Sequence, residues 1–549
     1  MTAETAGRAA IPSPRVSTPE GGFVLRLSLW LFYALLAAPL LGLIVLALRP
    51  AARTGGLVWT PALASTLTET FLLLGGVGLL SSALGVGAAW LIAMYRFPGR
   101  EWLAVMLVLP LALPTYLAAY LAVEMTDFFG PFQRLLRTMN GATSRRDYWF
   151  PEVRSLPGAI VILSLVLFPY IYLPARLMFE RQVGRIIYAA RLHGARGFGL
   201  FFRIGLPLAR PAIAAGATFA LLETLNDVGA VEHLGVQSLS LAVRSLWLNR
   251  GNLPGAAQVS LGCLVLVGII LLAEHTMRRH AAYANSSRAG APLTPMRLRG
   301  WQSWAASFAC ALPVIIAFVL PTLFLVAEAI KSVSKHGFTP GLLLALGNSV
   351  LLSLAAAIAV GILGGAIGIA SRVLKGRIAQ FAPRLATLGY AIPGSVLVIA
   401  LLPVYSVLDD GLVAISPSLI ISGTLTAILL AYVIRFAGIG ITQVEASLAR
   451  MSPNIDHAAR TLGSGINRLA FEVLAPNIRR GVGLAVLFAF VDAMKELPAT
   501  LLLRPLNMET LATSLYAFAS GGAFESGAVE ALLLFGIGLV PVLLLARAR

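Results

Sequence analysis

Long stretches without a charged residue constrain this chain more than any other feature of its sequence. A lipid bilayer has a hydrocarbon core about 30 Å thick, which takes about 20 apolar helical residues to cross. Nine charge-free windows reach that length: 27–48, 70–95, 102–123, 155–175, 251–273, 300–327, 336–371, 385–408 and 411–434. A shorter window covers 531–546, and two further apolar stretches, 211–222 and 481–491, end at Glu223 and Asp492. The pattern predicts an all-α polytopic membrane protein with twelve transmembrane helices.

The composition excludes most other classes of protein. Hydrophobic residues make up 58% of the 549 residues and charged residues only 12%, whereas soluble domains carry about 25% charged residues. Disordered, collagen-like and ordinary globular proteins do not have this composition. The two cysteines, Cys263 and Cys310, lie inside apolar runs. They are too few for a disulfide framework or a cysteine-rich metal site, and we predict that they are small buried apolar residues.

The positive charge of the chain is concentrated in a few loops. Lys and Arg number 42 against 24 Asp and Glu, a formal net charge of +18. In a polytopic chain, basic residues mark the cytoplasmic loops, so the charge does not indicate nucleic-acid binding. With the N-terminus inside, the cytoplasmic loops are 96–101, 176–210, 274–299, 372–384 and 435–480, and these loops are rich in arginine. We therefore expect a multi-pass protein of the bacterial inner membrane with both termini in the cytoplasm.

A motif that occurs twice divides the chain into halves. The first copy comprises Ala189-Ala190-Arg191, Gly194, Leu206 and Pro207, and the second comprises Ala458-Ala459-Arg460, Gly463 and Pro476. Corresponding residues are 269 positions apart (194 + 269 = 463), as are Glu223 and Asp492. An even number of helices in each half makes the two repeats parallel. We predict a cytoplasmic tail at 1–26, a six-helix domain at 27–273, a cytoplasmic linker at 274–300 and a second six-helix domain at 301–549.

This motif, Ala-Ala-x-x-x-Gly with Leu-Pro further on, resembles the "EAA" signature of the permease subunits of ABC importers. The signature of that family lies in the cytoplasmic loop between the fourth and fifth helices, where both copies are predicted here. A glycine ends a helix by adopting a left-handed conformation, and a proline suits the start of the next helix. The residues that match the signature region are Tyr188, Ala189, Ala190, Gly194, Leu206, Pro207, His457, Ala458, Ala459, Gly463 and Pro476. Tyr188 and His457 stand where the family often has Glu.

The resemblance implies partner proteins, and the sequence lacks the phosphate-binding motif of an ATPase. It implies that both loops dock onto two copies of a cytoplasmic ABC ATPase, and that a periplasmic binding protein delivers the solute. The four lysines, Lys331, Lys335, Lys375 and Lys495, do not occur in a G-x-x-x-x-G-K-[ST] sequence. We therefore expect no ATP site, no cofactor and no enzymatic activity in this chain, and ATP bound only by the partner subunits.

Acidic residues interrupt the fifth helix of each half and are the candidate translocation path. Glu223 and Asp227 are four residues apart, as are Asp492 and Glu496, so each pair is expected to share a helix face. Ionisable residues in membrane spans usually face a cavity or a partner. Lys495 follows Asp492 by three residues, so a structural ion pair between them is the alternative interpretation. No metal site is predicted.

The solute is suggested only by a finer resemblance. The segments Leu222–Gly229 and Val491–Thr500, the latter followed by Leu503-Arg504-Pro505, are similar to fused two-domain permeases of bacterial ferric-iron importers. The resemblance implies Fe³⁺ as the cargo, and carboxylates suit such a hard cation. Thiamine or another small solute is the alternative, because thiamine permeases are also fused. An ion-coupled secondary transporter would use the same acids but does not account for the repeated motif. A membrane enzyme would need a clustered site, whereas the six histidines are predicted to be scattered over loops.

Overall fold

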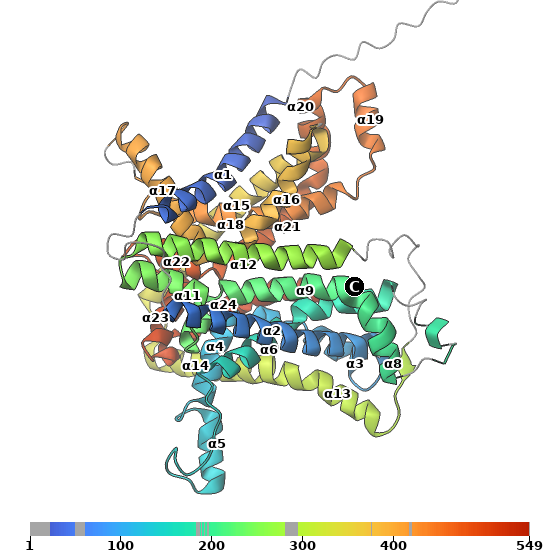
Figure 1. Cartoon of the computed structure of the whole chain (residues 1–549), viewed down its shortest axis with the longest axis vertical. Coiled ribbons are helices and arrows are strands. Elements are labelled where there is room, and N and C mark those ends of the chain that lie inside the picture. Colours follow the sequence, from blue (N-terminus) through green and yellow to red (C-terminus); the bar gives the residue numbers. More distant parts are fainter. Residues whose placement is uncertain are drawn as a thin grey trace, which may run out of the picture.

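The computed structural model describes residues 22–49, 61–182, 187, 189–191, 193–194, 197–279, 295–374, 376–416 and 420–547. Most of these residues are helical (Figure 1). Up to the linker, the elements are α1 (Phe23–Ala47), α2 (Pro61–Met94), β1 (Tyr95–Arg96), α3 (Arg100–Met106), η1 (Leu109–Ala112), α4 (Thr115–Thr126), α5 (Pro131–Asn140), α6 (Leu156–Leu177), η2 (Met178–Gln182), α8 (Gly197–Leu200), η3 (Phe201–Gly205), α9 (Leu206–Asn226), α10 (Val228–His233), α11 (Leu239–Arg244), η4 (Ser245–Asn249) and α12 (Leu253–Arg279).

After the linker, the chain forms a comparable series of elements. They are β2 (Met296–Arg297), α13 (Trp301–Val314), η6 (Ile315–Val319), α14 (Leu320–His336), α15 (Pro340–Val373), α16 (Arg377–Ala391), α17 (Gly394–Val413), α18 (Leu425–Leu448), α19 (Asn454–Thr461), α20 (Ile466–Arg468), η7 (Leu469–Leu474), α21 (Ala475–Met494), α22 (Pro498–Leu503), α23 (Leu511–Ser520), η8 (Phe524–Gly527) and α24 (Ala528–Arg547). The two short strands β1 and β2 pair in parallel, so the segment that leads into α13 is tied to the end of α2.

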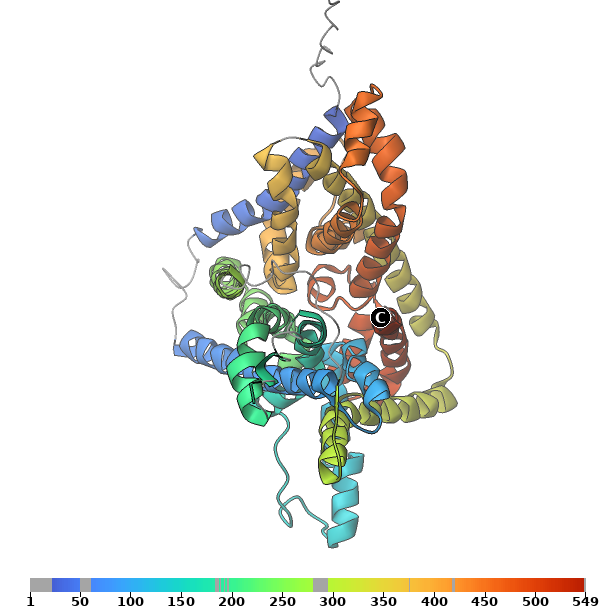
Figure 2. The same cartoon turned by 90° about the vertical axis from the view of Figure 1, so that its right-hand side faces the viewer.

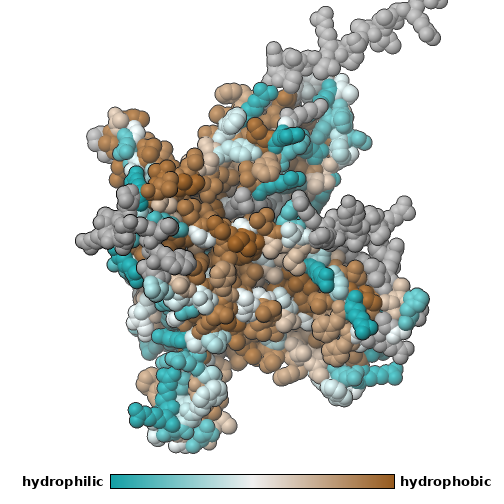
Figure 3. Space-filling model, in the orientation of Figure 1, coloured by the Kyte–Doolittle hydropathy of each residue, from teal (hydrophilic) through white to brown (hydrophobic). Residues whose placement is uncertain are grey.

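Among the described residues, eleven helices are long and apolar enough to cross a membrane. The count reaches twelve when the bent pair Arg100–Ala112 and Thr115–Asn140 is taken as one span with a break of 95°. Many large apolar side chains on these helices are exposed to the surroundings, as expected for contact with lipid. Figure 3 shows a broad hydrophobic band on one face, with hydrophilic residues gathered on the α5 segment that projects below it. The prediction of an all-α polytopic membrane protein is confirmed.

The first helix of each half packs against the other half. α1 lies against α17 and α15, which follow the linker in sequence, and also against α12 of its own half. In turn, α13 contacts α2 and α3, and α14 contacts α4. Figures 1 and 2 both show the blue α1 beside yellow and orange helices, away from α2. We call this packing of first helices on the opposite half the exchange of first helices. Together with contacts of α24 with η1 and of α17 with α12, it joins the two halves of the sequence.

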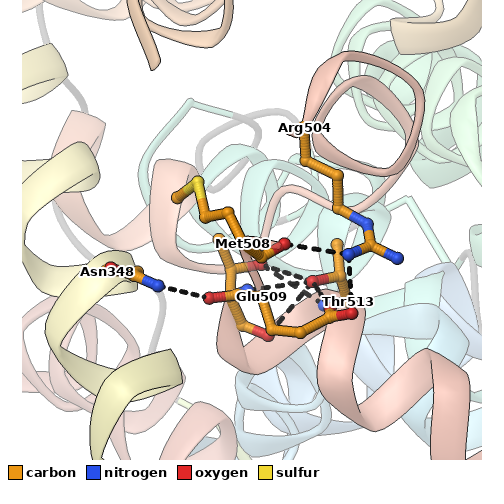
Figure 4. Close-up of polar contacts among 6 residues, drawn as sticks. Asn348, Arg504, Met508, Glu509 and Thr513 are labelled. Atoms are coloured by element: carbon orange, nitrogen blue, oxygen red, sulfur yellow. Dashed lines mark hydrogen bonds and ion pairs between the residues drawn. The ribbon is translucent and has the colours of Figure 1, made fainter. Parts of the chain in front are cut away.

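A matching hydrogen bond occurs in each half between the second long helix and a later short helix. Thr70 in α2 accepts a hydrogen bond from the backbone N–H of Leu239 at 3.1 Å, and Ser349 in α15 accepts one from Leu511 at 2.8 Å. In the second half, residues near Ser349 and Leu511 in sequence form a larger network, which is drawn in Figure 4. Arg504 donates to Glu509 at 2.6 Å, and the backbone carbonyl of Glu509 accepts from Asn348 at 3.0 Å. These contacts brace the segment that follows Glu496.

Several boundaries differ from the sequence-based expectations. The predicted span 411–434 corresponds to α18, which begins only at Leu425 and runs to Leu448. The predicted loop 435–480 therefore starts inside a helix. The fifth helix of each half also starts earlier than expected: continuous helical segments run over Gly197–Asn226 and Ile466–Met494, each through a π-helical stretch. The π-turns precede Pro207 and Pro476, which have no N–H to donate, so the helices continue across both prolines.

The histidines are also placed differently from the prediction. His233, His275, His336 and His457 lie in α10, α12, α14 and α19, not in loops. His193 lies in a turn, and His280 is outside the described residues. Cys263 and Cys310 are both buried and free, as the apolar runs around them predicted.

Candidate functional site: a charged cavity lined by both halves

One cavity draws its walls from residues before and after the linker. Its volume is about 110 Å³. The first half contributes Leu111, Leu113, Pro114, Thr115, Tyr116, Val166, Leu167, Tyr170, Glu223, Asn226 and Asp227. The second half contributes Tyr390, Arg435, Phe436, Asp492, Lys495, Glu496 and Pro498. An apolar shell with a few converging polar groups is the usual composition of a ligand site.

The structure brings all five candidate path residues together in this cavity. They are Glu223, Asp227, Asp492, Lys495 and Glu496. With Arg435, the cavity has four acidic and two basic side chains, a formal charge of −2 (2 − 4). In the described part of the chain, no three His, Cys, Asp or Glu side chains are placed to hold a metal ion. The acids therefore share a cavity without forming a ready-made metal site.

The two acids of each pair do not share one continuous helix, which corrects the spacing argument. Asp227 has φ −84° and ψ 90°, so α9 ends there and α10 begins. Its carboxylate accepts a hydrogen bond from the backbone N–H of Ala230 at 2.8 Å and caps α10. Glu496 follows the end of α21 and accepts from the N–H of Ala499 at 3.0 Å, at the start of α22. In each half, the second acid therefore occupies a helix break and accepts a hydrogen bond from the first turn of the next short helix.

The acids of the second half face two cations. Arg435 in α18 forms an ion pair with Glu496 at 3.1 Å, with the two side chains only 7% and 6% exposed. It also donates to the carbonyl of Ile392 at 3.2 Å. Lys495 lines the cavity beside Gly538 of α24, where an added Cβ would lie 2.6 Å from its Nζ. In the described chain no ion pair within 4.0 Å joins Lys495 to Asp492, so the structural pairing considered from the sequence is not made.

Arg435 is the functional candidate that the sequence analysis missed. The sequence predicts Arg435 as the first residue of a cytoplasmic loop, because a charge at the end of an apolar run normally marks the membrane surface. In the structure it is buried well inside α18. The apolar run Phe436–Ile441 that follows it, interrupted only by glycines, is the signal in the sequence that could have extended the helix.

The comparisons with known proteins identify the chain. A model of the "binding-protein-dependent transport system inner membrane component" family matches residues 81–275. The molybdenum transport system permease protein of Escherichia coli K12 is 30% identical over 207 residues, which are 37% of this chain and 87% of that protein. The chain belongs to this family. It is a permease subunit of an ABC importer, and its family is one of transport proteins, not of enzymes.

Two other relatives match longer parts of the permease. The Fe(3+)-transport system permease protein FbpB 2 of Haemophilus influenzae is 25% identical over 499 residues, 90% of this chain and 92% of that protein. The sulfate transport system permease protein of Salmonella typhimurium LT2 is 24% identical over 268 residues, 47% of this chain and 92% of that protein. One relative therefore matches the permease over nearly the full length of both chains. The other two relatives match over most of their own length but cover less than half of the permease.

The motif residues lie away from the cavity, at the ends of the fifth helices. Gly194 and Gly463 have φ of +84° and +82°, the left-handed conformation expected of a glycine that ends a helix. His457 and Ala458 are exposed on α19, whereas Ala459 is buried against its own half. In the first copy Ala189 is exposed and Ala190 half-buried, and Tyr188 lies outside the described residues. Leu206 and Pro207 begin α9, and Pro476 is in the first turn of α21.

Proposed function

We propose that this permease forms the translocation path for ferric iron delivered by a periplasmic binding protein. The observation that carries the proposal is the cavity formed by both halves, with its four carboxylates and formal charge of −2. Oxygen ligands and negative charge suit a hard, highly charged cation. The similarity to a Fe(3+)-transport permease over 90% of the chain supports the same cargo.

The charge of the cavity also bears on the other solutes that relatives carry. Sulfate is a dianion, and a site of formal charge −2 would repel it. Thiamine or another small organic solute is the alternative cargo, because aromatic side chains, Tyr116, Tyr170 and Tyr390, share the lining. An ion-coupled secondary transporter is a less favoured alternative, because membership of the binding-protein-dependent family implies an ATPase partner.

Uptake by cells that express the complete importer tests the cargo. We expect energised uptake of radiolabelled ferric iron, and no comparable uptake of thiamine, molybdate or sulfate. The double variant Glu223→Gln/Asp492→Asn should lose most iron uptake, because it removes one cavity acid from each half. Glu525→Gln is the matched control, since Glu525 is a partly exposed acid paired with Lys335 outside the cavity and the motif loops. Uptake of thiamine instead of iron by the unaltered importer would overturn the proposal.

The proposed topology follows from the repeats. The tail 1–26, the domains 27–273 and 301–549 and the linker 274–300 would lie in a bacterial inner membrane with both termini in the cytoplasm. The motif loops, rich in arginine, would then face the cytoplasm. Two relatives match over nearly their whole length but cover less than half of this chain, which supports a fusion of two units.

Two copies of a cytoplasmic ABC ATPase are proposed to dock on the motif loops, one on each. The short helix α19 projects with exposed residues at its tip, and Leu462, directly before Gly463, is 85% exposed. An exposed leucine beside a helix end is a suitable anchor for a groove on another protein. Leu462→Asp should abolish co-purification of the ATPase from detergent extracts. Leu506→Asp is the control, since Leu506 is 98% exposed on the α22–α23 connection. Equal co-purification of both variants would exclude this docking site.

A further inference from the structure

Beside the charged cavity, the first half contains three aromatic side chains with polar atoms that lack partners. The hydroxyls of Tyr116 and Tyr120 and the Nε2 of His233 are buried and make no hydrogen bond. Tyr116 and Tyr120 are only 4% and 1% exposed. A buried polar atom without a partner costs about 1–3 kcal/mol, so two hydroxyls and one imidazole nitrogen next to one another need an explanation.

These side chains form one group, which we name the Tyr-His cluster. Tyr116 and Tyr120 are one turn apart on α4, with ring centroids 5.9 Å apart. The ring of His233 in α10 lies 4.7 Å from that of Tyr120. Gly229 allows α10 to approach: a Cβ there would lie 3.3 Å from the Tyr120 hydroxyl and 2.8 Å from Leu497 Cδ2. Tyr116 also lines the charged cavity with Asp227, so the cluster continues the cavity wall along α4.

The second half has no comparable cluster at the matching positions, all of which are described. α4 and α17 both begin after a proline of nearly identical conformation, Pro114 (φ −54°, ψ 140°) and Pro393 (φ −55°, ψ 139°). The counterparts of Tyr116 and Tyr120 are therefore Ser395 and Ile399 (116 + 279 = 395), and that of His233 is Leu502 (233 + 269 = 502). Because the repeated architecture is built with Ser, Ile and Leu there, the phenols and the imidazole are not needed for the fold.

We propose that the Tyr-His cluster is a transient binding site for ferric iron, through Tyr116 Oη, Tyr120 Oη and His233 Nε2. This inference rests on the proposed cargo and adds a site to it. Phenolate oxygens and imidazole nitrogen are ligands of Fe³⁺, a hard cation. Each phenol that binds the ion releases one proton to water. Two phenolates with the neighbouring Asp227 carboxylate supply three negative charges, which balance the ion in a buried site.

The cations that line the cavity come from the second half of the sequence. Arg435 and Lys495 belong to the second half, and their counterparts in the first half, Val166 and Asn226, are uncharged. The first half thus contributes two acids and no cation to the cavity lining, and the second half contributes two acids and two cations. This difference in charge favours a trivalent cation at the first-half residues of the lining, which include Tyr116 and Asp227.

The site can be tested on the purified permease in lipid nanodiscs without its partners. Titration with ferric nitrilotriacetate should produce the visible charge-transfer absorption of phenolate bound to Fe³⁺. Tyr116→Phe and Tyr120→Phe should each weaken binding by about tenfold or more, and the double variant should abolish the band. The matched control is Tyr405→Phe, since Tyr405 is equally buried but donates a hydrogen bond to Ala427 at 2.7 Å. Monodisperse elution and an unchanged melting temperature will show that each variant is folded.

The outcomes separate this inference from the proposed cargo. Absence of the band in the unaltered permease, or its persistence in the double variant, overturns the Tyr-His cluster as an iron site. If such a result accompanies normal uptake of radiolabelled iron, the proposed function stands and only the cluster is excluded. If cells take up no iron but the band appears and depends on both tyrosines, the cluster binds the metal and the proposed cargo is wrong. Retained iron uptake by the double variant would show that transport does not use the cluster.

Discussion

Arg435 and Glu496 form an ion pair in which both side chains are buried, 7% and 6% exposed. Removing one partner of a buried pair leaves a charge without compensation and costs about 3–5 kcal/mol. We therefore expect Arg435→Met to lower the melting temperature of the purified permease and to impair uptake. The further change Glu496→Gln should recover part of the lost stability, because it removes the uncompensated charge.

The control for this ion pair lies on the surface. Arg468 and Glu472 form an i, i+4 pair with 67% and 62% of the side chains exposed. Exposed pairs contribute little to stability, so Arg468→Met should leave the melting temperature unchanged. Equal effects of Arg435→Met and Arg468→Met would contradict a structural role for the buried pair.

A second prediction at this scale concerns pH and lies outside the membrane spans. Backbone N–H groups of Ser144 and Thr143 donate to the Asp147 carboxylate and hold its pKa below the ordinary value of 3.8. A lowered pKa in the folded state means that the stabilisation is present above the unfolded pKa and is lost as pH falls through the folded pKa. Asp147→Asn should therefore speed amide hydrogen exchange of residues 143–147 at neutral pH. Exchange as slow as in the unaltered permease would contradict this.

The acids of the cavity were identifiable from the sequence, and the groups that surround them were not. Glu223 and Asp492 interrupt apolar runs at matching positions, and charge in a membrane span is costly enough to be informative. Arg435 gives the opposite signal in sequence, because it ends an apolar window as a loop residue would. Tyr120 and His233 are unremarkable in sequence, since only the packing of α4 against α10 brings them together.

Helices α15 and α18 cross at a contact of backbone against backbone. A Cβ on Gly364 would lie 2.6 Å from the carbonyl carbon of Gly440, so neither helix can give way by moving a side chain. Small residues permit such close crossings in membrane proteins. Gly364→Ala should therefore lower stability by about 1–3 kcal/mol, the range found for overpacked cores.

The matched control is on the same helix. Gly347 of α15 has no heavy atom within 4 Å of an added Cβ, so Gly347→Ala should preserve or slightly raise stability. Melting temperatures of the two variants in detergent make the comparison. Similar values for both would show that the α15–α18 crossing tolerates a methyl group.

At the scale of elements, the sequence was most informative where hydrophobicity alone decides the structure. The windows 27–48 and 251–273 lie almost entirely within α1 and α12. Prediction failed where polar or proline-containing stretches are helical. The segments before Pro207 and Pro476 contain π-turns that let the fifth helices continue, and hydropathy contains no signal for such a turn.

The exchange of first helices is a property of the whole molecule that no local pattern contains. α1 precedes α2 in the chain, yet it packs against α15 and α17. Its start is fixed by a hydrogen bond from the Gly22 N–H to Asn467 Oδ1 at 2.9 Å, and Tyr33 donates to the carbonyl of Ile378 at 2.8 Å. Contacts between residues hundreds of positions apart are set by packing, whereas the repeat predicted only that two similar units exist.

This exchange predicts how the permease behaves when its linker is cut. Fragments 1–285 and 286–549, expressed together, should co-purify through an affinity tag on one of them, because α1 and the α13–α14 segment each pack on the other fragment. A first fragment shortened to 61–285 lacks α1, so it should retain far less of its partner. The uncut permease with a cleavage site in the linker is the control for correct folding. Since the linker would then only connect two units, cleaved and uncut permease should take up the solute at similar rates. Equal retention of the partner with and without α1 would mean that the cavity-side contacts, not the exchanged helices, hold the halves together.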